Sequence, residues 1–151
     1  METVPLRGTV SSQARERFSL AVPFRVLSGR PKVSPADAGA LGWILPSVGS
    51  WYGRAVPTAC RRAGFEPQVL PEVTDTAATL ALVEAGVGVS VVTDLMLRLR
   101  PSRLDVLGLH EVMERHIVVV LRSFAEHRPT VTALVDVLRA SASLHAPTAQ
   151  A

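Results

Sequence analysis

Residues 74–94 read TDTAATLALVEAGVGVSVVTD, and this stretch decides the fold. Its first half predicts a helix over residues 74–86, because Thr74, Asp75 or Thr76 can supply an N-cap oxygen before a run of Ala, Leu and Val. Its second half, VGVSVV, is a valine-rich run without charged residues, which is typical of a strand buried on both faces. A helix that leads directly into such a strand favours an α/β fold.

The pair Gly86 and Gly88 raises the question of a nucleotide-binding loop. Such a loop requires the order strand, GxGxxG, helix, so that phosphate groups meet the N-terminus of the helix. Here the order is reversed, and Val91 stands where the third glycine would be. The glycines follow the negative end of the helix dipole, which argues against phosphate binding. We expect Gly86 to end the helix and Gly88 to allow a tight turn into the sheet.

The flanking sequence continues the alternation of strands and helices. Ser34, Pro35 and Asp37 form a helix-start signal with a capping box. Because strands alternate with helices, the predicted class is α/β with a mostly parallel sheet. Residues 1–17 show no clear period and, like residues 146–151, are interpreted as a tail. The other expected strands lie near residues 17–23, 43–45, 67–73, 104–107 and 115–121, and further helices lie near residues 54–64 and 129–140.

The composition limits the classes to which this protein can belong. The 151 residues suit one domain or two small lobes, and 48% hydrophobic with 19% charged residues is a globular composition. The net charge of +3 is too small to indicate nucleic-acid binding. No apolar run reaches the roughly 18 residues of a membrane span, and nothing resembles a signal peptide. We therefore expect a soluble cytoplasmic protein without membrane contact.

Two polar segments lie between an expected strand and an expected helix. Thr74, Asp75 and Thr76 stand at a helix start, where free N–H groups and hydroxyls suit an anion or a carboxylate; the alternative is that they only cap the helix. Residues 47–50, SVGS, are small enough to bring backbone donors close to a ligand; the alternative is a plain surface loop. The residues alone leave both alternatives open.

Signals of catalysis and metal binding are weak. Gly49-Ser50 is not followed by the second glycine of a nucleophile elbow. The four histidines share no metal-ligand spacing, and the single cysteine, Cys60, excludes a cysteine-rich site. With no nucleophile or acid–base pair, we expect neither an enzyme, nor a cofactor, nor a metal site.

Taken together, these elements resemble a known family. AGFEPQVLPEVTDTAATLALVEAGVGVSVVTD (residues 63–94) is similar to the signature of the effector-binding domain of LysR-type transcriptional regulators. GRPKVSPADAGALGWILPSVGS (residues 29–50) and RHIVVVLRSFAEHRPTVTALVDVLRA (residues 115–140) are similar to its flanking segments. The resemblance covers about residues 18–145.

The resemblance implies a periplasmic-binding-protein-like fold of type 2, with a ligand cleft between two α/β lobes. Lobe two would be complete, at about residues 31–106, whereas lobe one would be partial, at residues 18–30 and 107–145. A small, anionic effector such as a carboxylate would bind in the cleft and modulate transcription. The residues that the resemblance assigns to the ligand are Ser47, Val48, Gly49, Ser50, Thr74, Asp75 and Thr76, with Val22, Pro23 and Phe24 from lobe one.

The chain also departs from the family pattern. It looks N-terminally truncated, because the helix-turn-helix, the linker helix and the first part of lobe one have no counterpart, and Thr93 replaces a usual proline. Contact with DNA would then run only through a helix-turn-helix domain absent from this chain, and dimerisation would involve itself or a related regulator. Alternatives are a non-sensing interaction fragment that dimerises with an intact regulator and a relative of solute-binding proteins.

Overall fold

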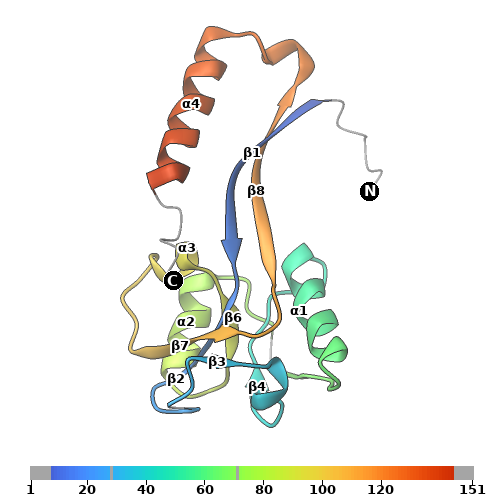
Figure 1. Cartoon of the computed structure of the whole chain (residues 1–151), viewed down its shortest axis with the longest axis vertical. Coiled ribbons are helices and arrows are strands. Elements are labelled where there is room, and N and C mark those ends of the chain that lie inside the picture. Colours follow the sequence, from blue (N-terminus) through green and yellow to red (C-terminus); the bar gives the residue numbers. More distant parts are fainter. Residues whose placement is uncertain (1–7, 28, 71, 145–151) are drawn as a thin grey trace. The chain divides into compact units, whose positions relative to one another are not determined.

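The computed structural model describes residues 8–27, 29–70 and 72–144, and the chain divides into two compact units (Figure 1). Unit 1 combines Met1–Glu16 with Glu114–Ala151, and unit 2 is Arg17–Met113. The expected lobe boundaries, at residues 31 and 106, differ from this division. The reason is that the strand at residues 19–23 lies inside the sheet of unit 2, between two strands of that unit.

The elements follow the alternation that the sequence predicts. Unit 2 contains β2 (Ser19–Pro23), β3 (Lys32–Val33), η1 (Pro35–Ala38), β4 (Gly42–Trp43), α1 (Trp51–Arg62), β5 (Gln68–Val69), α2 (Thr76–Glu84), β6 (Ser90–Val92), α3 (Asp94–Leu97) and β7 (Leu104–Leu109). Unit 1 contains β1 (Gly8–Arg17), β8 (Glu114–Arg122), η2 (Ser123–Ala125) and α4 (Pro129–Leu144).

The sheet of unit 2 is mixed, which corrects the expectation of a mostly parallel sheet. The strand order is β3-β7-β2-β6, with β2 antiparallel to both β6 and β7 and with β3 parallel to β7. The strands that fit the prediction are β4 and β5, which pair in parallel, and Trp43 forms a further parallel bridge with Val89 just before β6. The antiparallel member is β2, whose partners lie far along the chain and leave no local signal.

The helix-start signal at Ser34 is confirmed. The Ser34 hydroxyl accepts a hydrogen bond from the Ala36 N–H at 3.4 Å, and the Asp37 carboxylate accepts one from the Ser34 N–H at 2.8 Å. This backbone hydrogen bond, helped by the Arg30 guanidinium, holds the pKa of Asp37 below its usual value. The element is a single 3₁₀ turn because Gly39 follows it at once.

The interpretation of residues 1–17 as a tail is wrong for residues 8–17, which form β1. In unit 1, β1 pairs with β8, and the two strands run in opposite directions (Figure 1). The Arg115 guanidinium donates to the Glu16 carboxylate at 2.7 Å across this pair. The segment GTVSSQARER lacks apolar alternation, so its strand conformation comes from a partner about a hundred residues away.

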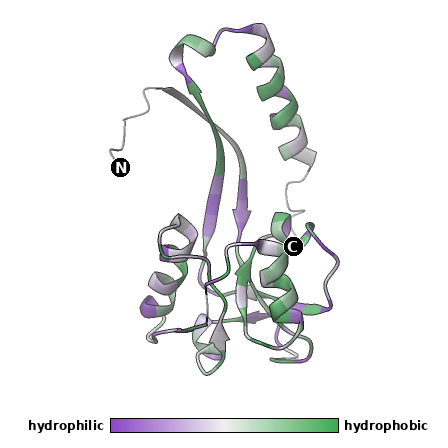
Figure 2. Ribbon diagram, turned by 180° about the vertical axis from the view of Figure 1, so that it is seen from behind, coloured by the Kyte–Doolittle hydropathy of each residue, from purple (hydrophilic) through white to green (hydrophobic). Residues whose placement is uncertain are grey.

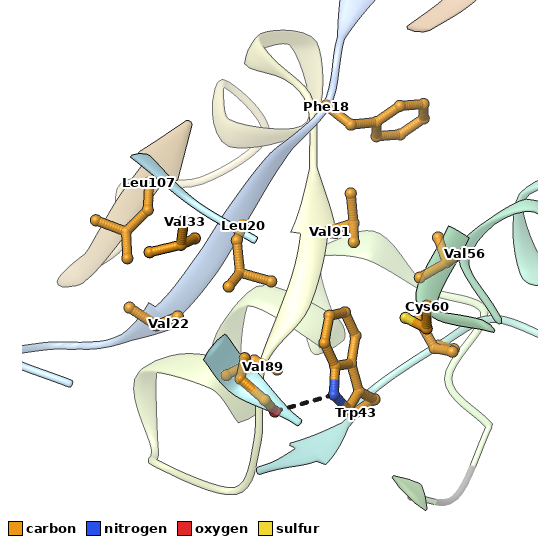
Figure 3. Packing of buried hydrophobic residues seen from close by; sticks show 12 residues of the cluster. Phe18, Leu20, Val22, Val33, Trp43, Val56, Cys60, Val89, Val91 and Leu107 are labelled. Carbon is orange, nitrogen blue, oxygen red and sulfur yellow. Dashed lines mark hydrogen bonds between the residues drawn. The ribbon is translucent and has the colours of Figure 1, made fainter. Parts of the chain in front are cut away.

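The core of unit 2 is built around Trp43, which is fully buried in a cluster with Leu20, Val22, Val89 and other apolar side chains (Figure 3). The indole Nε1 donates to the Ala38 carbonyl oxygen at 3.2 Å (Figure 3). A second cluster, which includes Ile44, Leu80 and Val83, packs α2 onto the same sheet. Burial on both faces explains the three valines at residues 89–92, and the hydroxyl of the buried Ser90 donates to the Ile44 carbonyl oxygen at 2.8 Å.

Cys60 lies in α1 and is 1% exposed, and burial raises the pKa of its thiol to about 11. Because only the thiolate reacts readily, we expect Cys60 to resist a thiol-specific reagent at pH 8 in the folded protein and to react within seconds in urea. The measurement is the time course of labelling with and without denaturant. Rapid labelling of the folded chain would contradict the buried position of Cys60.

None of the helices in the described residues has the length and apolar character needed to cross a membrane.

Candidate functional site

The candidate site lies at the carboxyl edge of the parallel strands in unit 2. β4 stands between β5 on one side and the chain at Val89 on the other. After β4 the chain passes through α1 to β5, and after β5 it passes through α2 to the opposite side of β4. Ligands of open α/β sheets bind outside the carboxyl ends of such strands, where the order of connections changes direction.

Hydrogen bonds bring the two predicted loops together at this edge. The Leu70 N–H donates to the Trp43 carbonyl at 2.8 Å, and the Val73 N–H donates to the Leu45 carbonyl at 3.1 Å. The chain at residues 70–73 therefore runs beside residues 43–45 beyond the end of the regular strands. The loops that follow, Ser47–Ser50 and Thr74–Thr76, leave the sheet as neighbours, and each leads into a helix.

The first loop is held by its own serines. The Ser50 hydroxyl accepts from the Gly53 N–H at 2.9 Å as the N-cap of α1 and donates to the Ser47 carbonyl at 2.8 Å. The Ser47 hydroxyl accepts from the Gly49 N–H at 3.3 Å. A Cβ at Gly53 would lie 2.1 Å from the Ser47 carbonyl oxygen, so only glycine lets the loop pack this closely on α1. Val48 is 63% exposed at the tip.

In the second loop, Asp75 is the N-cap of α2. The sequence had left Thr74, Asp75 and Thr76 as candidates for this position. The Asp75 carboxylate accepts from the Ala78 N–H at 2.7 Å, and its carbonyl accepts from the N–H of Thr79. Among the described residues, the hydroxyls of Thr74 and Thr76 and the N–H groups of Thr76 and Ala77 have no hydrogen-bond partner. These donors remain available to a ligand, although the Asp75 charge offsets the positive end of the α2 dipole.

Val22, Pro23 and Phe24 do not join these loops. In the antiparallel pairing of β2 with β6, Ser19 lies opposite Val92 and Ala21 lies opposite Ser90. The later residues of β2 therefore point towards the start of β6, which is the amino edge of the parallel strands. The structure thus corrects the expectation that this strand end lines the same site: Val22 is fully buried in the core, and Phe24 lies beyond the strand under the Arg25 guanidinium.

Sequence reasoning missed three residues at the carboxyl edge. Phe18 stands just before β2 and stacks on Tyr52 in the first turn of α1, with ring centroids 5.3 Å apart. The Tyr52 hydroxyl donates to the Val91 carbonyl at the end of β6. Thr93 follows β6 and caps α3 through its hydroxyl. Phe18 reaches the carboxyl edge because β2 pairs antiparallel with β6 and β7. No local sequence pattern predicts this position.

The described residues contain no group of three or more His, Cys, Asp or Glu side chains that could hold a metal ion. The edge instead presents backbone N–H groups, hydroxyls and the Arg54 guanidinium, which lies 3.5 Å from the Gly49 carbonyl. Such groups are hydrogen-bond donors of the kind that a small polar molecule can accept from.

This mixed α/β fold is the periplasmic-binding-protein-like fold of type 2. The family model described as the LysR substrate binding domain matches residues 10–143, and the chain belongs to this family. The family consists of domains of transcription regulators and not of enzymes. No curated protein is significantly similar to the chain.

Solved structures agree with this assignment. The chain is similar to the CcmR regulatory domain of Synechocystis PCC6803 in complex with 2-PG, with a TM-score of 0.79 and 17% identity, covering 94% of this chain and 70% of that chain. It is also similar to the effector binding domain of QuiR in complex with shikimate, with a TM-score of 0.76 and 15% identity. That match covers 97% of this chain and 70% of the QuiR chain. For CbnR, a LysR family transcriptional regulator, the TM-score is 0.72 and the identity 25%, covering 94% of this chain and 50% of CbnR.

Proposed function

We propose that this chain is a ligand-sensing regulatory domain that binds a small, anionic effector at the carboxyl edge of β4 and β5. The observation that carries the proposal is the set of unpartnered donors at the start of α2, beside the loop Ser47–Ser50. The related domains of CcmR and QuiR are described in complex with 2-PG and shikimate, which supports binding of a small molecule here. The proposal places the protein in the cytoplasm.

The anionic preference rests on the start of α1. This helix has no acidic residue in its first turn, so the positive end of its dipole is not offset there. Arg54 adds a guanidinium whose side chain reaches the loop at Gly49. In contrast, Asp75 places a carboxylate at the start of α2. We therefore expect a carboxylate of the effector to lie towards α1 and its hydroxyl groups to lie towards Thr74 and Thr76.

Ligand binding is tested with a thermal-shift screen of small carboxylates, with shikimate as one probe. Removing the two hydroxyls by Thr74→Val and Thr76→Val should weaken the best binder about tenfold, because a hydrogen bond contributes about 0.5–1.5 kcal/mol and tenfold equals 1.4 kcal/mol. Thr132→Val on α4 is the matched control and should leave affinity unchanged. The measurement is isothermal titration of each variant.

Two results would contradict the proposal. The first is that no carboxylate raises the melting temperature of this chain, while the CcmR regulatory domain responds to 2-PG in the same assay. The second is that the double threonine variant binds as tightly as the parent. This result would reject Thr74 and Thr76 as ligand-binding residues and would mean that the ligand binds elsewhere on the chain.

A second candidate function is an interaction fragment that dimerises with itself or with a related regulator, without sensing. The chain spans 50% of the length of CbnR, a LysR family transcriptional regulator. The observation that favours this candidate is the exposed apolar surface of unit 1, where Val118, Val120 and Phe124 are all exposed.

A further inference from the structure

Beside β4, the chain at residues 89–92 carries one backbone carbonyl that the parallel ladder cannot pair. The Val89 carbonyl accepts from the Ile44 N–H at 2.8 Å, and the Val89 N–H donates to the Gly42 carbonyl at 2.8 Å. If this parallel ladder continued, the next carbonyl to be paired would be that of Val91, and its donor would be the N–H two residues after Ile44. That residue is Pro46, which has no N–H. The ladder therefore ends at Pro46, and the Val91 carbonyl needs another donor.

Tyr52, in the first turn of α1, supplies that donor. Its hydroxyl donates to the Val91 carbonyl, and Val91 is 1% exposed. Because a buried carbonyl without a hydrogen-bond partner is costly, this pairing is favoured over a free Tyr52 hydroxyl. The ring of Phe18 stacks on that of Tyr52 at an interplanar angle of 12° and restricts it further. The start of α1 is thus attached to the sheet at the point where β4 ends.

The other attachments of α1 to the core lie beyond its first turn. Val56 and Cys60 pack into the core cluster and are each 1% exposed. Pro57 cannot donate the helical hydrogen bond to the Gly53 carbonyl, so the first turn is also less firmly joined to the turns that follow. Figure 2 shows α2 mainly in the green of hydrophobic residues, whereas α1 is a mixture that ends in purple. The first turn of α1 therefore depends on Tyr52 for its position.

That turn in turn fixes the loop Ser47–Ser50. The Gly53 N–H donates to the Ser50 hydroxyl at 2.9 Å, and the Ser50 N–H donates to the Ser47 carbonyl at 2.8 Å. A Cβ at Gly53 would lie 2.5 Å from the Pro46 carbonyl oxygen, so the turn and the loop are packed backbone against backbone. A displacement of the first turn of α1 therefore also displaces the loop and the N–H groups that the proposed function offers to a carboxylate.

We propose that Tyr52 is a positioning residue of the effector site. Its hydroxyl, bound to the Val91 carbonyl, holds the start of α1 and the loop Ser47–Ser50 in the arrangement that receives the carboxylate of the effector. The effect on affinity rests on the proposed function above, whereas the hold on the loop is a property of unit 2 without any ligand. The two parts are tested by separate measurements.

Hydrogen exchange of the full chain without ligand tests the hold on the loop. Tyr52→Phe removes the hydroxyl and keeps the ring. The amides of Ser50 and Gly53 should then exchange about tenfold faster, because a hydrogen bond that opposes local opening is lost. Ser90→Ala is the matched control, since it removes a hydroxyl that donates to the Ile44 carbonyl at 2.8 Å. This control should leave exchange at both amides within about twofold of the parent.

Isothermal titration tests the effect on the site. With shikimate as the probe, Tyr52→Phe should raise the dissociation constant about tenfold, because binding must then order the loop. The carboxamide of shikimate lacks the charge that is expected to lie towards α1, so its dissociation constant should rise by less than about threefold. A general loss of stability would weaken both probes equally.

Four results would overturn the proposal. Exchange at Ser50 and Gly53 could be as slow in Tyr52→Phe as in the parent, or Ser90→Ala could accelerate it as much as Tyr52→Phe does. Shikimate could bind the parent and Tyr52→Phe equally well, or Tyr52→Phe could weaken shikimate and its carboxamide to the same extent. If no carboxylate binds the parent while Tyr52→Phe still speeds exchange in the loop, the proposed function fails and the hold of Tyr52 on the loop stands.

Discussion

Replacing Trp43 by alanine is expected to lower the free energy of unfolding by about 3–5 kcal/mol, the largest change that we predict for this chain. The side chain is fully buried at the centre of unit 2 and packs on Phe65, with ring centroids 5.9 Å apart. Alanine would leave a cavity and would also leave the Ala38 carbonyl without the indole donor. Small domains are stable by about 5–15 kcal/mol, so much of the stability would be lost.

A second substitution, Trp43→Phe, separates packing from hydrogen bonding at this position, and Val48→Ala is a control at an exposed position. Trp43→Phe keeps most of the ring but loses the N–H, so its cost should be about 1–3 kcal/mol. Val48→Ala removes an exposed side chain and should change stability by less than about 0.5 kcal/mol. Urea unfolding followed by circular dichroism measures all three. If Trp43→Ala costs no more than Trp43→Phe, the central packing of Trp43 would be refuted.

The second large effect is expected at Gly88, for a reason that differs from that at Gly86. A Cβ at Gly88 would lie 2.5 Å from the Gly42 carbonyl oxygen and 2.9 Å from a methyl carbon of Leu70. The Gly42 carbonyl cannot move away easily, because it accepts a hydrogen bond from the Val89 N–H at 2.8 Å. Gly88→Ala should therefore cost about 1–3 kcal/mol or more. Gly86 has φ +80° and open space around it, so Gly86→Ala should cost about 1–2 kcal/mol from backbone strain alone.

Substitution by asparagine distinguishes backbone strain at Gly86 from steric overlap at Gly88. Because asparagine tolerates the left-handed conformation, Gly86→Asn should recover most of the stability lost in Gly86→Ala. Gly88→Asn should be no more stable than Gly88→Ala, because the larger side chain meets the same backbone. Thermal and urea unfolding of the four variants provide the comparison. Recovery by asparagine at Gly88 would show that this position, too, is decided by its φ angle.

Much of the fold could be predicted because its signals are local. The Ser34 capping box and Gly86 beyond α2 each depend on residues within a few positions of one another, and the same kind of signal limited the N-cap of α2 to Thr74, Asp75 or Thr76. The order of elements also followed from such signals. Gly86 ends α2 as predicted, whereas Gly88 is required for close packing against Gly42 and not for a turn. That contact is with a segment more than forty residues away, and no local pattern encodes it.

The candidate site was predictable in part for the same reason. Ser47–Ser50 and Thr74–Thr76 each stand between a strand and a helix, so their place at the carboxyl edge follows from connections that the sequence shows. Val22–Phe24 were misplaced because the direction of β2 in the sheet is set by its pairing with β6 and β7. The same pairing brings Phe18 onto Tyr52, a contact that the sequence does not announce.

Local chemistry was thus enough to indicate the α/β class and several helix ends, because caps, glycines and apolar runs act over one or two turns of chain. The family was indicated separately, by the resemblance of three long segments to a known pattern. Only the tertiary structure decided that residues 8–17 form a strand, that β2 runs against its neighbours, and which loops meet at the edge of unit 2. Strand pairing joins residues about a hundred positions apart, and its free energy depends on the facing partner rather than on the segment itself.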